Sequence, residues 1–130
     1  MKTEEIFRTI DHTLLKPYAV WEDVDRLCEE AQEHHTASVC IPPCYVAPVR
    51  EKYGKLRICT VIGFPLGYSV KEAKICETLQ ALSDGADEID MVVKIADVKN
   101  HAYDRVEEEI RAIKEACGAH VLKVIVETCY

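Results

Sequence analysis

The chain has 130 residues, of which 48% are hydrophobic and 30% charged, a composition ordinary for a soluble globular protein of about one domain. Its 16 basic and 23 acidic residues give a formal net charge of -7, which disfavours nucleic acid or an anionic membrane surface as a partner. No stretch approaches the roughly 18 apolar residues of a membrane span, and the N-terminal sequence is too acidic for a signal peptide, so we expect a cytoplasmic protein with no membrane partner.

Short β-rich apolar runs alternate along the chain with segments of helical periodicity. In chain order, the expected strands are residues 11–15, 37–42, 57–64, 88–93 and 120–126. Short helices are expected over residues 3–9 and after "PPCYV", and longer ones around 21–31, 75–82 and 106–117, where apolar residues share one helical face. This alternation predicts an α/β fold with a mostly parallel sheet.

Residues typical of helix starts and helix ends support the same organisation. The "SVKE" sequence at 69–72 is a capping-box pattern that predicts the start of the middle long helix, and Gly85 and Gly118 stand where helices should end. No low-complexity linker and no break in composition occurs. We therefore expect residues 1–130 to belong to one domain.

The seven cysteines predict reduced, buried thiols, because their number is odd and most lie in apolar periodic stretches. No Cys-x-x-Cys pair occurs, and the adjacent His34 and His35 cannot form the usual metal clamp, so no metal site is expected. Cys40 is interpreted as a small buried hydrophobe, since no histidine is placed by sequence to activate it as a nucleophile.

A repeat relates two polar residues. "GADEID" at 85–90 and "GAHVLK" at 118–123 each join a helix end to a strand, so Asp90 and Lys123 occupy equivalent positions in successive βα units. Strand alternation puts Glu88, Asp90, Val92 and Lys94 on one face and the apolar Ile89, Met91 and Val93 on the other. The apolar face suits a helix layer, and Asp90 should face the opposite side, which in a barrel is the lumen.

Several polar residues admit two interpretations. Asp90 is either a buried carboxylate satisfied by a lysine or by backbone amides, or a general acid/base in a barrel mouth. Lys123 is either an ion-pair partner or, with a lowered pKa, an amine nucleophile toward carbonyls. Asp11, His12 and Thr13 could feed a polar network, and the two glycines of "GFPLG" either bring the backbone near a ligand or only turn the chain.

Five motifs, in this order and spacing, resemble the 2-deoxyribose-5-phosphate aldolase family: "IDHTLLKP" (10–17), "SVCIPP" (38–43), "GFPLG" (63–67), "GADEIDMVV" (85–93) and "LKVIVET" (122–128). The resemblance runs from about residue 5 to the last residue. It implies a (β/α)₈ TIM barrel that cleaves 2-deoxy-D-ribose 5-phosphate reversibly to glyceraldehyde 3-phosphate and acetaldehyde. A lysine Schiff base would carry the reaction, with a small phosphorylated sugar as substrate and with no metal or organic cofactor.

The resemblance also implies site residues. Asp90 matches the family's proton donor and acceptor, Lys123 a lysine near the reacting centre, and Asp11 an aspartate of the supporting network. Thr13 matches the neighbour of that aspartate and is expected to bind the substrate. Cys40 matches a cysteine that lies near the substrate and is not needed for the reaction. Lys94 is a departure, because the family commonly has asparagine there.

The resemblance places the imine-forming lysine in a sixth-strand repeat, which a further spacing of about 33 residues would put beyond residue 130. Such a barrel typically takes ~250 residues. We therefore expect a partial barrel of about five βα units, truncated after its fifth strand, with little or no aldolase activity alone. The alternative is a non-catalytic scaffold whose exposed strand edges pair with other copies, and in either case we expect a homodimer or larger oligomer.

Overall fold

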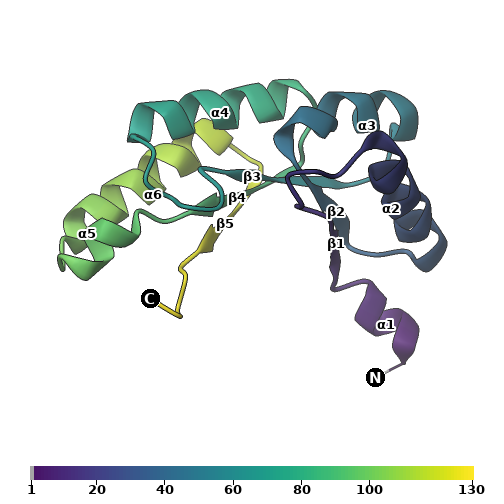
Figure 1. Ribbon diagram of the computed structural model, residues 1–130, viewed down its shortest axis with the longest axis horizontal. Coiled ribbons are helices and arrows are strands. Elements are labelled where there is room, and N and C mark those ends of the chain that lie inside the picture. Colours follow the sequence, from purple (N-terminus) through teal and green to yellow (C-terminus); the bar gives the residue numbers. More distant parts are fainter. Residues whose placement is uncertain (1) are drawn as a thin grey trace.

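The computed structural model describes residues 2–130 and contains one five-stranded parallel sheet in the order β1-β2-β3-β4-β5 (Figure 1). Each strand therefore pairs with its neighbour in sequence, as successive βα units require. The strands are β1 (Asp11–Thr13), β2 (Ser38–Ile41), β3 (Ile58–Ile62), β4 (Glu88–Val92) and β5 (Val121–Ile125). The five predicted strands and their parallel arrangement are confirmed.

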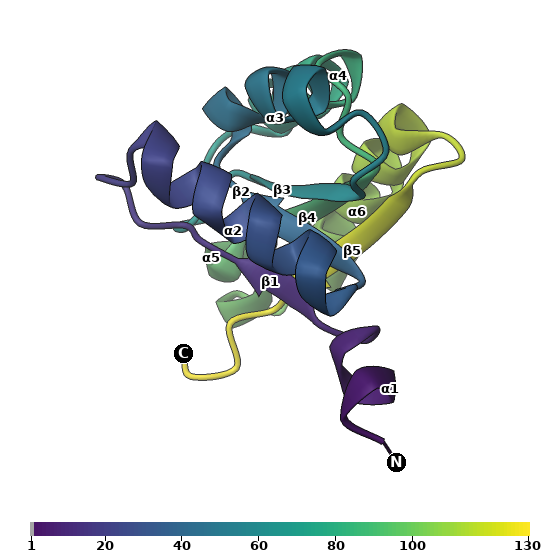
Figure 2. The ribbon, with the colours of Figure 1, turned by 90° about the vertical axis from the view of Figure 1, so that its right-hand side faces the viewer.

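Most of the helices cover the convex side of this sheet, whereas the N-terminal helix lies beyond the start of the first strand, and the opposite side of the sheet is open (Figures 1 and 2). The helices are α1 (Thr3–Phe7), α2 (Trp21–His34), α3 (Val46–Tyr53) after the 3₁₀ turn η1 (Pro43–Tyr45), α4 (Lys71–Ser83), α5 (Ile95–Lys99) and α6 (Tyr103–Cys117). The sheet and its helices together form an arc, which is the predicted partial barrel. No helix within residues 2–130 has the length and apolarity needed to cross a membrane.

The main hydrophobic core lies between the sheet and the helices. Ile89 and Met91 of β4 are fully buried in it. A separate small cluster of Cys40, Cys59 and Val61 forms on the other side of the sheet. The predicted alternation along β4 is thus confirmed, since Ile89 and Met91 face the helices and Asp90 faces the inside of the arc.

Helices α4 and α6 are joined by a buried ion pair that the sequence did not indicate. The Lys74 side chain is fully buried, and its Nζ donates to Glu109 Oε1 at 3.0 Å and to the carbonyl of Val92 at 2.9 Å. Glu109 Oε2 accepts a hydrogen bond from the backbone amide of Lys94. This pair therefore fixes the end of β4 to the helix layer behind it.

The "GFPLG" segment turns the chain between β3 and α4. Gly63 and Gly67 have φ angles of 60° and 68°, and the Phe64–Pro65 peptide bond is cis. A Cβ at Gly67 would lie 2.3 Å from the carbonyl oxygen of Val93, so only glycine fits this approach to the end of β4. The motif thus turns the chain, and the interpretation that its glycines bring the backbone near a ligand stays a prediction.

The helix ends agree only in part with the prediction. Gly118 directly follows α6 with a φ of 56°, and Gly85 lies just after α4 with a φ of 107°, so both glycine terminations are confirmed. The capping box at 69–72 is wrong: α4 begins at Lys71, its N-cap is Val70, and no side chain caps it. Ser69 lies one residue too early in the chain to reach the free amides of the first turn. The short helix α5 was not predicted, because five residues carry too little periodicity.

Candidate active site

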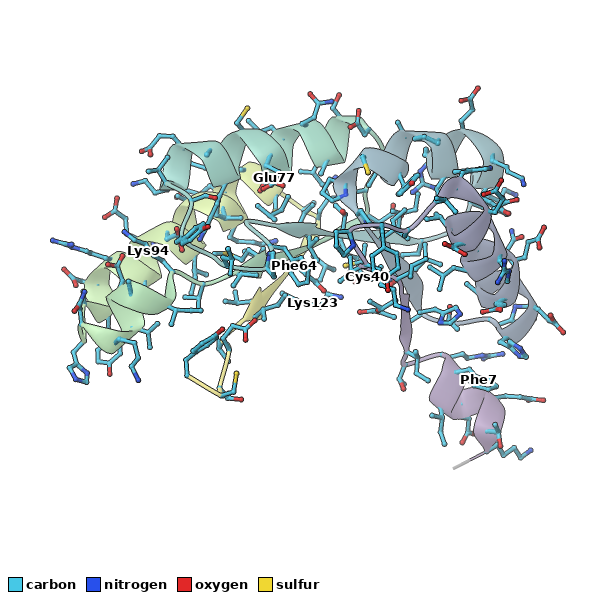
Figure 3. All side chains as sticks on the ribbon, in the orientation of Figure 1. Phe7, Cys40, Phe64, Glu77, Lys94 and Lys123 are labelled. Carbon is cyan, nitrogen blue, oxygen red and sulfur yellow. The ribbon has the colours of Figure 1, made fainter. Side chains whose placement is uncertain are left out.

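Polar residues of the strands gather on the inner side of the arc. Partners in neighbouring parallel strands point to the same face, and the register pairs Asp90 with Lys123, Thr13 with Cys40, and Cys40 with Cys59. Figure 3 shows Cys40 and Lys123 on the side of the sheet away from α3 and α4. The repeat that placed Asp90 and Lys123 at equivalent positions thus leads to direct contact.

The ammonium of Lys123 is the centre of a charged cluster. Its Nζ lies 2.5 Å from Asp11 Oδ2, 3.1 Å from Asp90 Oδ1 and 3.2 Å from Glu88 Oε2. Asp11 belongs to β1 and Lys123 to β5, so this contact spans the arc from its first strand to its last. The structure therefore brings together Asp11, Asp90 and Lys123, three of the residues that the sequence singled out.

The cluster keeps Lys123 and Asp11 charged. Partial burial by itself would lower the pKa of Lys123, but the hydrogen bond to Asp11 and the charge of Asp90 outweigh it and raise that pKa above its ordinary value. Burial would likewise raise the pKa of Asp11, but hydrogen bonds from Lys123 and from Ser38 Oγ at 2.7 Å lower it overall. A protonated lysine is no nucleophile, so in this arrangement Lys123 acts as an ion-pair partner.

Asp90 differs from Asp11 in its hydrogen bonding. Its Oδ1 atom is buried and has no hydrogen-bond partner among residues 2–130, because the approach to Lys123 Nζ at 3.1 Å lacks hydrogen-bond alignment. The side chain keeps 17% of its surface exposed toward the inside of the arc. An under-partnered carboxylate that a ligand can reach suits proton transfer.

Thr13 and Cys40 lie beside the charged cluster without joining it. Thr13 Oγ1 donates to the backbone carbonyl of Asp11 at 2.7 Å. Cys40 is only 3% exposed, which confirms its interpretation as a buried thiol. A hollow of about 270 Å³ opens next to them at the carboxyl ends of the strands, where barrel enzymes hold their ligands. Its lining residues include Leu15, Pro42, Val61, Phe64 and Pro65.

The cysteines as a group follow the prediction only in part. All seven are free. Cys28, Cys40, Cys59 and Cys117 are buried as expected. Cys44, Cys76 and Cys129 are exposed, so for them the prediction of burial is wrong. Cys44 and Cys76 line one outer groove, beyond the reach of the core, and Cys129 follows the last strand.

Lys94 does not belong to this site. The strand ends at Val92, and Lys94 is the N-cap residue of α5 with its Nζ 3.2 Å from Asp97 Oδ2. The predicted strand extends past the end of β4, and the Lys94 ammonium pairs with Asp97 of α5 and does not join the cluster at Asp90. Figure 3 shows Lys94 far from Lys123, near α5.

Sequence reasoning missed three residues of the site. Glu88 contacts Lys123, Ser38 donates to Asp11, and Cys59 lies beside Cys40. Glu88 stood two residues before Asp90 on the same predicted face, which was a sufficient signal for including it. Ser38 and Cys59 needed the register between strands, which no local pattern supplies.

Comparison with known proteins identifies the family. The sequence pattern of the DeoC/LacD family aldolases matches residues 6–130. The chain belongs to the DeoC/LacD aldolase family. A deoxyribose-phosphate aldolase of Clostridium botulinum (strain Alaska E43 / Type E3) is 61% identical over 131 residues, covering 100% of this chain and 59% of the relative. One of Clostridioides difficile (strain 630) is 54% identical over 128 residues, covering 98% and 58%.

Solved structures of the family share the fold. A candidate deoxyribose-phosphate aldolase from Coccidioides immitis superposes with a TM-score of 0.94 at 35% identity, covering 98% of this chain and 51% of that one. The tetrameric deoxyribose phosphate aldolase from Aeropyrum pernix gives a TM-score of 0.81 at 34% identity, covering 97% and 54%. The chain thus spans between half and three fifths of the length of these aldolases, and the resemblance seen in its motifs is confirmed.

Proposed function

We propose that residues 1–130 form the N-terminal part of a class I aldolase barrel that cleaves 2-deoxyribose 5-phosphate reversibly to glyceraldehyde 3-phosphate and acetaldehyde. The observation that carries this proposal is the buried Oδ1 of Asp90, which pairs with Lys123 but accepts no hydrogen bond within residues 2–130, on the inner face of an aldolase-family chain. The names of the relatives support deoxyribose phosphate as the substrate. The proposal involves no metal and no organic cofactor.

The geometry divides the work among three side chains. Asp90 accepts and returns protons during cleavage of the carbon–carbon bond, because one of its oxygens has no other partner. Lys123 holds a positive charge 3.1 Å from that oxygen. Asp11 positions Lys123 from the opposite side of the arc.

The amine that forms the Schiff base must be another lysine. Lys123 is held as an ammonium by Asp11, Asp90 and Glu88, and the resemblance assigns imine formation to a strand beyond β5. We therefore expect residues 1–130 alone to show little or no cleavage of 2-deoxyribose 5-phosphate.

A chimera tests this proposal. Residues 1–130 are joined to the part of the Clostridium botulinum relative that they do not cover, and glyceraldehyde 3-phosphate release is coupled to NADH oxidation. We expect activity in the chimera and a loss of about 100-fold or more in kcat with Asp90→Asn, because general acid/base catalysis contributes about 10²–10⁴-fold. Asp104→Asn, an exposed carboxylate in the first turn of α6, is the matched control. A folded chimera with no activity, or an active Asp90→Asn variant, would contradict the proposal.

The alternative function is that of a self-associating scaffold, and the free strand at each end of the sheet favours it. β1 and β5 are both edges, and near β5 Val121 and Val126 are 45% and 58% exposed. We propose pairing between copies through one of these edges. Light scattering of the 130-residue chain at micromolar concentration tests it, and a monodisperse monomer would rule it out.

A further inference from the structure

Two thiols and a carboxylate meet on the inner face of the sheet. The Sγ atoms of Cys40 and Cys59 and a carboxylate oxygen of Asp90 all lie within 4.8 Å of one another. They come from three adjacent strands, β2, β3 and β4. Cys40 and Cys59 are direct partners in the parallel register, which holds their side chains on one face.

This set of donor atoms is the kind that thiophilic divalent cations select. Zinc and its heavier relative cadmium bind thiolate sulfur together with carboxylate oxygen, with zinc–sulfur bonds of about 2.3 Å. A tetrahedral ion with such bonds spaces its ligand atoms about 3.8 Å apart, so rotation of the three side chains by roughly 1 Å completes the site.

These donors have few other polar contacts: the Cys59 thiol lies 3.9 Å from the carbonyl oxygen of Thr60, and Asp90 Oδ1 lies 3.1 Å from Lys123 Nζ. Asp90 Oδ1 is buried without a hydrogen-bond partner in the described part of the chain. Cys40 and Cys59 are 3% and 0% exposed and pack only in a small cluster with Val61 and Leu15, apart from the main core. Lys123 also donates a hydrogen bond to Asp11, so Asp90 is not its only partner.

We propose that Cys40, Cys59 and Asp90 form a binding site for a thiophilic divalent cation such as zinc or cadmium. The ion forms bonds to two sulfurs and one oxygen, the two thiols release their protons to solvent, and a fourth position is left for water. Local spacing could not show this site, because a Cys-x-x-Cys search looks within one segment and these ligands lie on three strands. Binding does not depend on aldolase activity. Inhibition of the barrel by the bound ion would follow only if the proposed function holds, since Asp90 would then be sequestered.

Cadmium binding to the 130-residue chain tests the site. Exposed thiols are first removed with Cys44→Ser, Cys76→Ser and Cys129→Ser. Cadmium binding during the titration is measured by the ultraviolet charge-transfer absorption from thiolate to cadmium and by equilibrium dialysis. We expect one cadmium ion per chain, and a weakening of at least about 100-fold with Cys40→Ala or Cys59→Ala, beyond the ~10–100-fold that loss of a merely supporting residue costs. Asp90→Asn should also weaken binding by at least about 100-fold, and it should leave the absorption band because both sulfur ligands remain.

The matched control is Cys28→Ala, a thiol of α2 that is equally buried but faces the main core. It should leave cadmium affinity unchanged. Circular dichroism checks that each variant is folded. The ¹¹³Cd chemical shift of the protein that carries only the three serine substitutions reports the number of sulfur ligands. Retained binding in the Cys59→Ala variant, lost binding in the Cys28→Ala variant, or a shift typical of oxygen ligands alone would overturn the proposal.

Discussion

The Lys123 side chain shows how neighbours determine what a residue can do. The same amine beside other cations would lose its proton readily, but here Asp11, Asp90 and Glu88 lie within 3.2 Å of its Nζ. The raised pKa of Lys123 keeps it an ammonium throughout the neutral range. Its role in the cluster is therefore electrostatic.

Chemical trapping checks this charge state. With an aldehyde and borohydride at pH 7 to 8, we expect Lys123 to stay unmodified in residues 1–130, because only the neutral amine forms an imine. Exposed lysines such as Lys55 should react first, and they serve as the internal control. Peptide mapping by mass spectrometry locates the adducts. Preferential labelling of Lys123 would contradict the assignment.

The Asp11–Lys123 ion pair should contribute a pH-dependent part of the stability. The pKa of Asp11 is lowered by folding, so its contribution is present above its ordinary value of 3.8 and is lost as the pH falls through the folded pKa. The pKa of Lys123 is raised, so its contribution is present below 10.5 and is lost as the pH rises through the folded value. Near neutral pH both contributions are complete.

We expect Asp11→Asn to lower the free energy of unfolding at pH 7 by only about 1 kcal/mol, because both side chains are about one third exposed to water. The difference from the native chain should shrink as the pH falls below 3.8. Urea denaturation across this pH range measures it, with Asp104→Asn as the control. A difference that stays constant with pH would show that Asp11 acts through packing instead.

For single residues of the charged cluster, the sequence predicted which side chains face the inside of the arc, but it did not predict all of their contacts. The alternation around Asp90 and the repeat containing Lys123 were enough to place both. The partnership with Asp11 could not be derived from local patterns, because it joins residues 112 positions apart and depends on the curvature of the sheet. The pairing of Lys94 with Asp97 was not predicted, because periodicity does not show where a strand ends.

At the scale of elements, the contact between α4 and α6 contains two ion pairs, one buried and one exposed to water. Lys74 and Glu109 are 0% and 7% exposed, whereas Lys71 and Glu108, close by, are 33% and 66% exposed. Burial makes a charge costly when its partner is removed, while water screens an exposed pair. The two pairs therefore provide an internal comparison.

We expect Lys74→Met to lower the free energy of unfolding by about 3 kcal/mol, because it leaves Glu109 charged and buried. The double variant Lys74→Met with Glu109→Leu should recover part of this loss. Lys71→Met, at the exposed pair, should cost at most about 1 kcal/mol. Urea denaturation of the four proteins measures these differences, and equal costs at Lys71 and Lys74 would refute the argument.

The elements themselves could largely be predicted from the sequence. Their apolar periods of two and of about 3.6 residues are set by the sheet and helix faces they bury. The burial of Lys74 was not predicted, because a lysine in a helical segment is expected to face solvent unless its ion-pair partner, here on α6, is known. The false capping box at Ser69 shows that a short motif can match without the backbone geometry that gives it meaning.

At the scale of the molecule, the arc leaves one strand edge free at each end. β1 has three residues, while β5 has five and carries the exposed Val121. A longer free edge with apolar side chains favours pairing between chains. The β5 edge is thus the better candidate for self-association.

Substitution of two valines near the β5 edge by lysine tests this assignment. If copies pair there, Val121→Lys with Val126→Lys should shift the 130-residue chain toward monomer, because lysine on an edge opposes pairing. Leu79→Lys, at a side chain of α4 that is 53% exposed, is the control for added charge. Light scattering over a range of concentrations gives the mass. Unchanged association in the double variant would exclude this edge.

The in-sequence strand order has a consequence for folding kinetics. Because every strand pairs with its neighbour in the chain, the strand pairings join residues 19 to 33 positions apart, whereas the bond from Asp11 to Lys123 closes a span of 112 residues. The entropy cost of closing so long a loop places this bond after the rate-limiting step. Asp11→Asn should then speed unfolding while leaving the refolding rate unchanged, which stopped-flow kinetics would show as a φ-value near zero. The charged cluster would be the last part of the arc to form and the first to open.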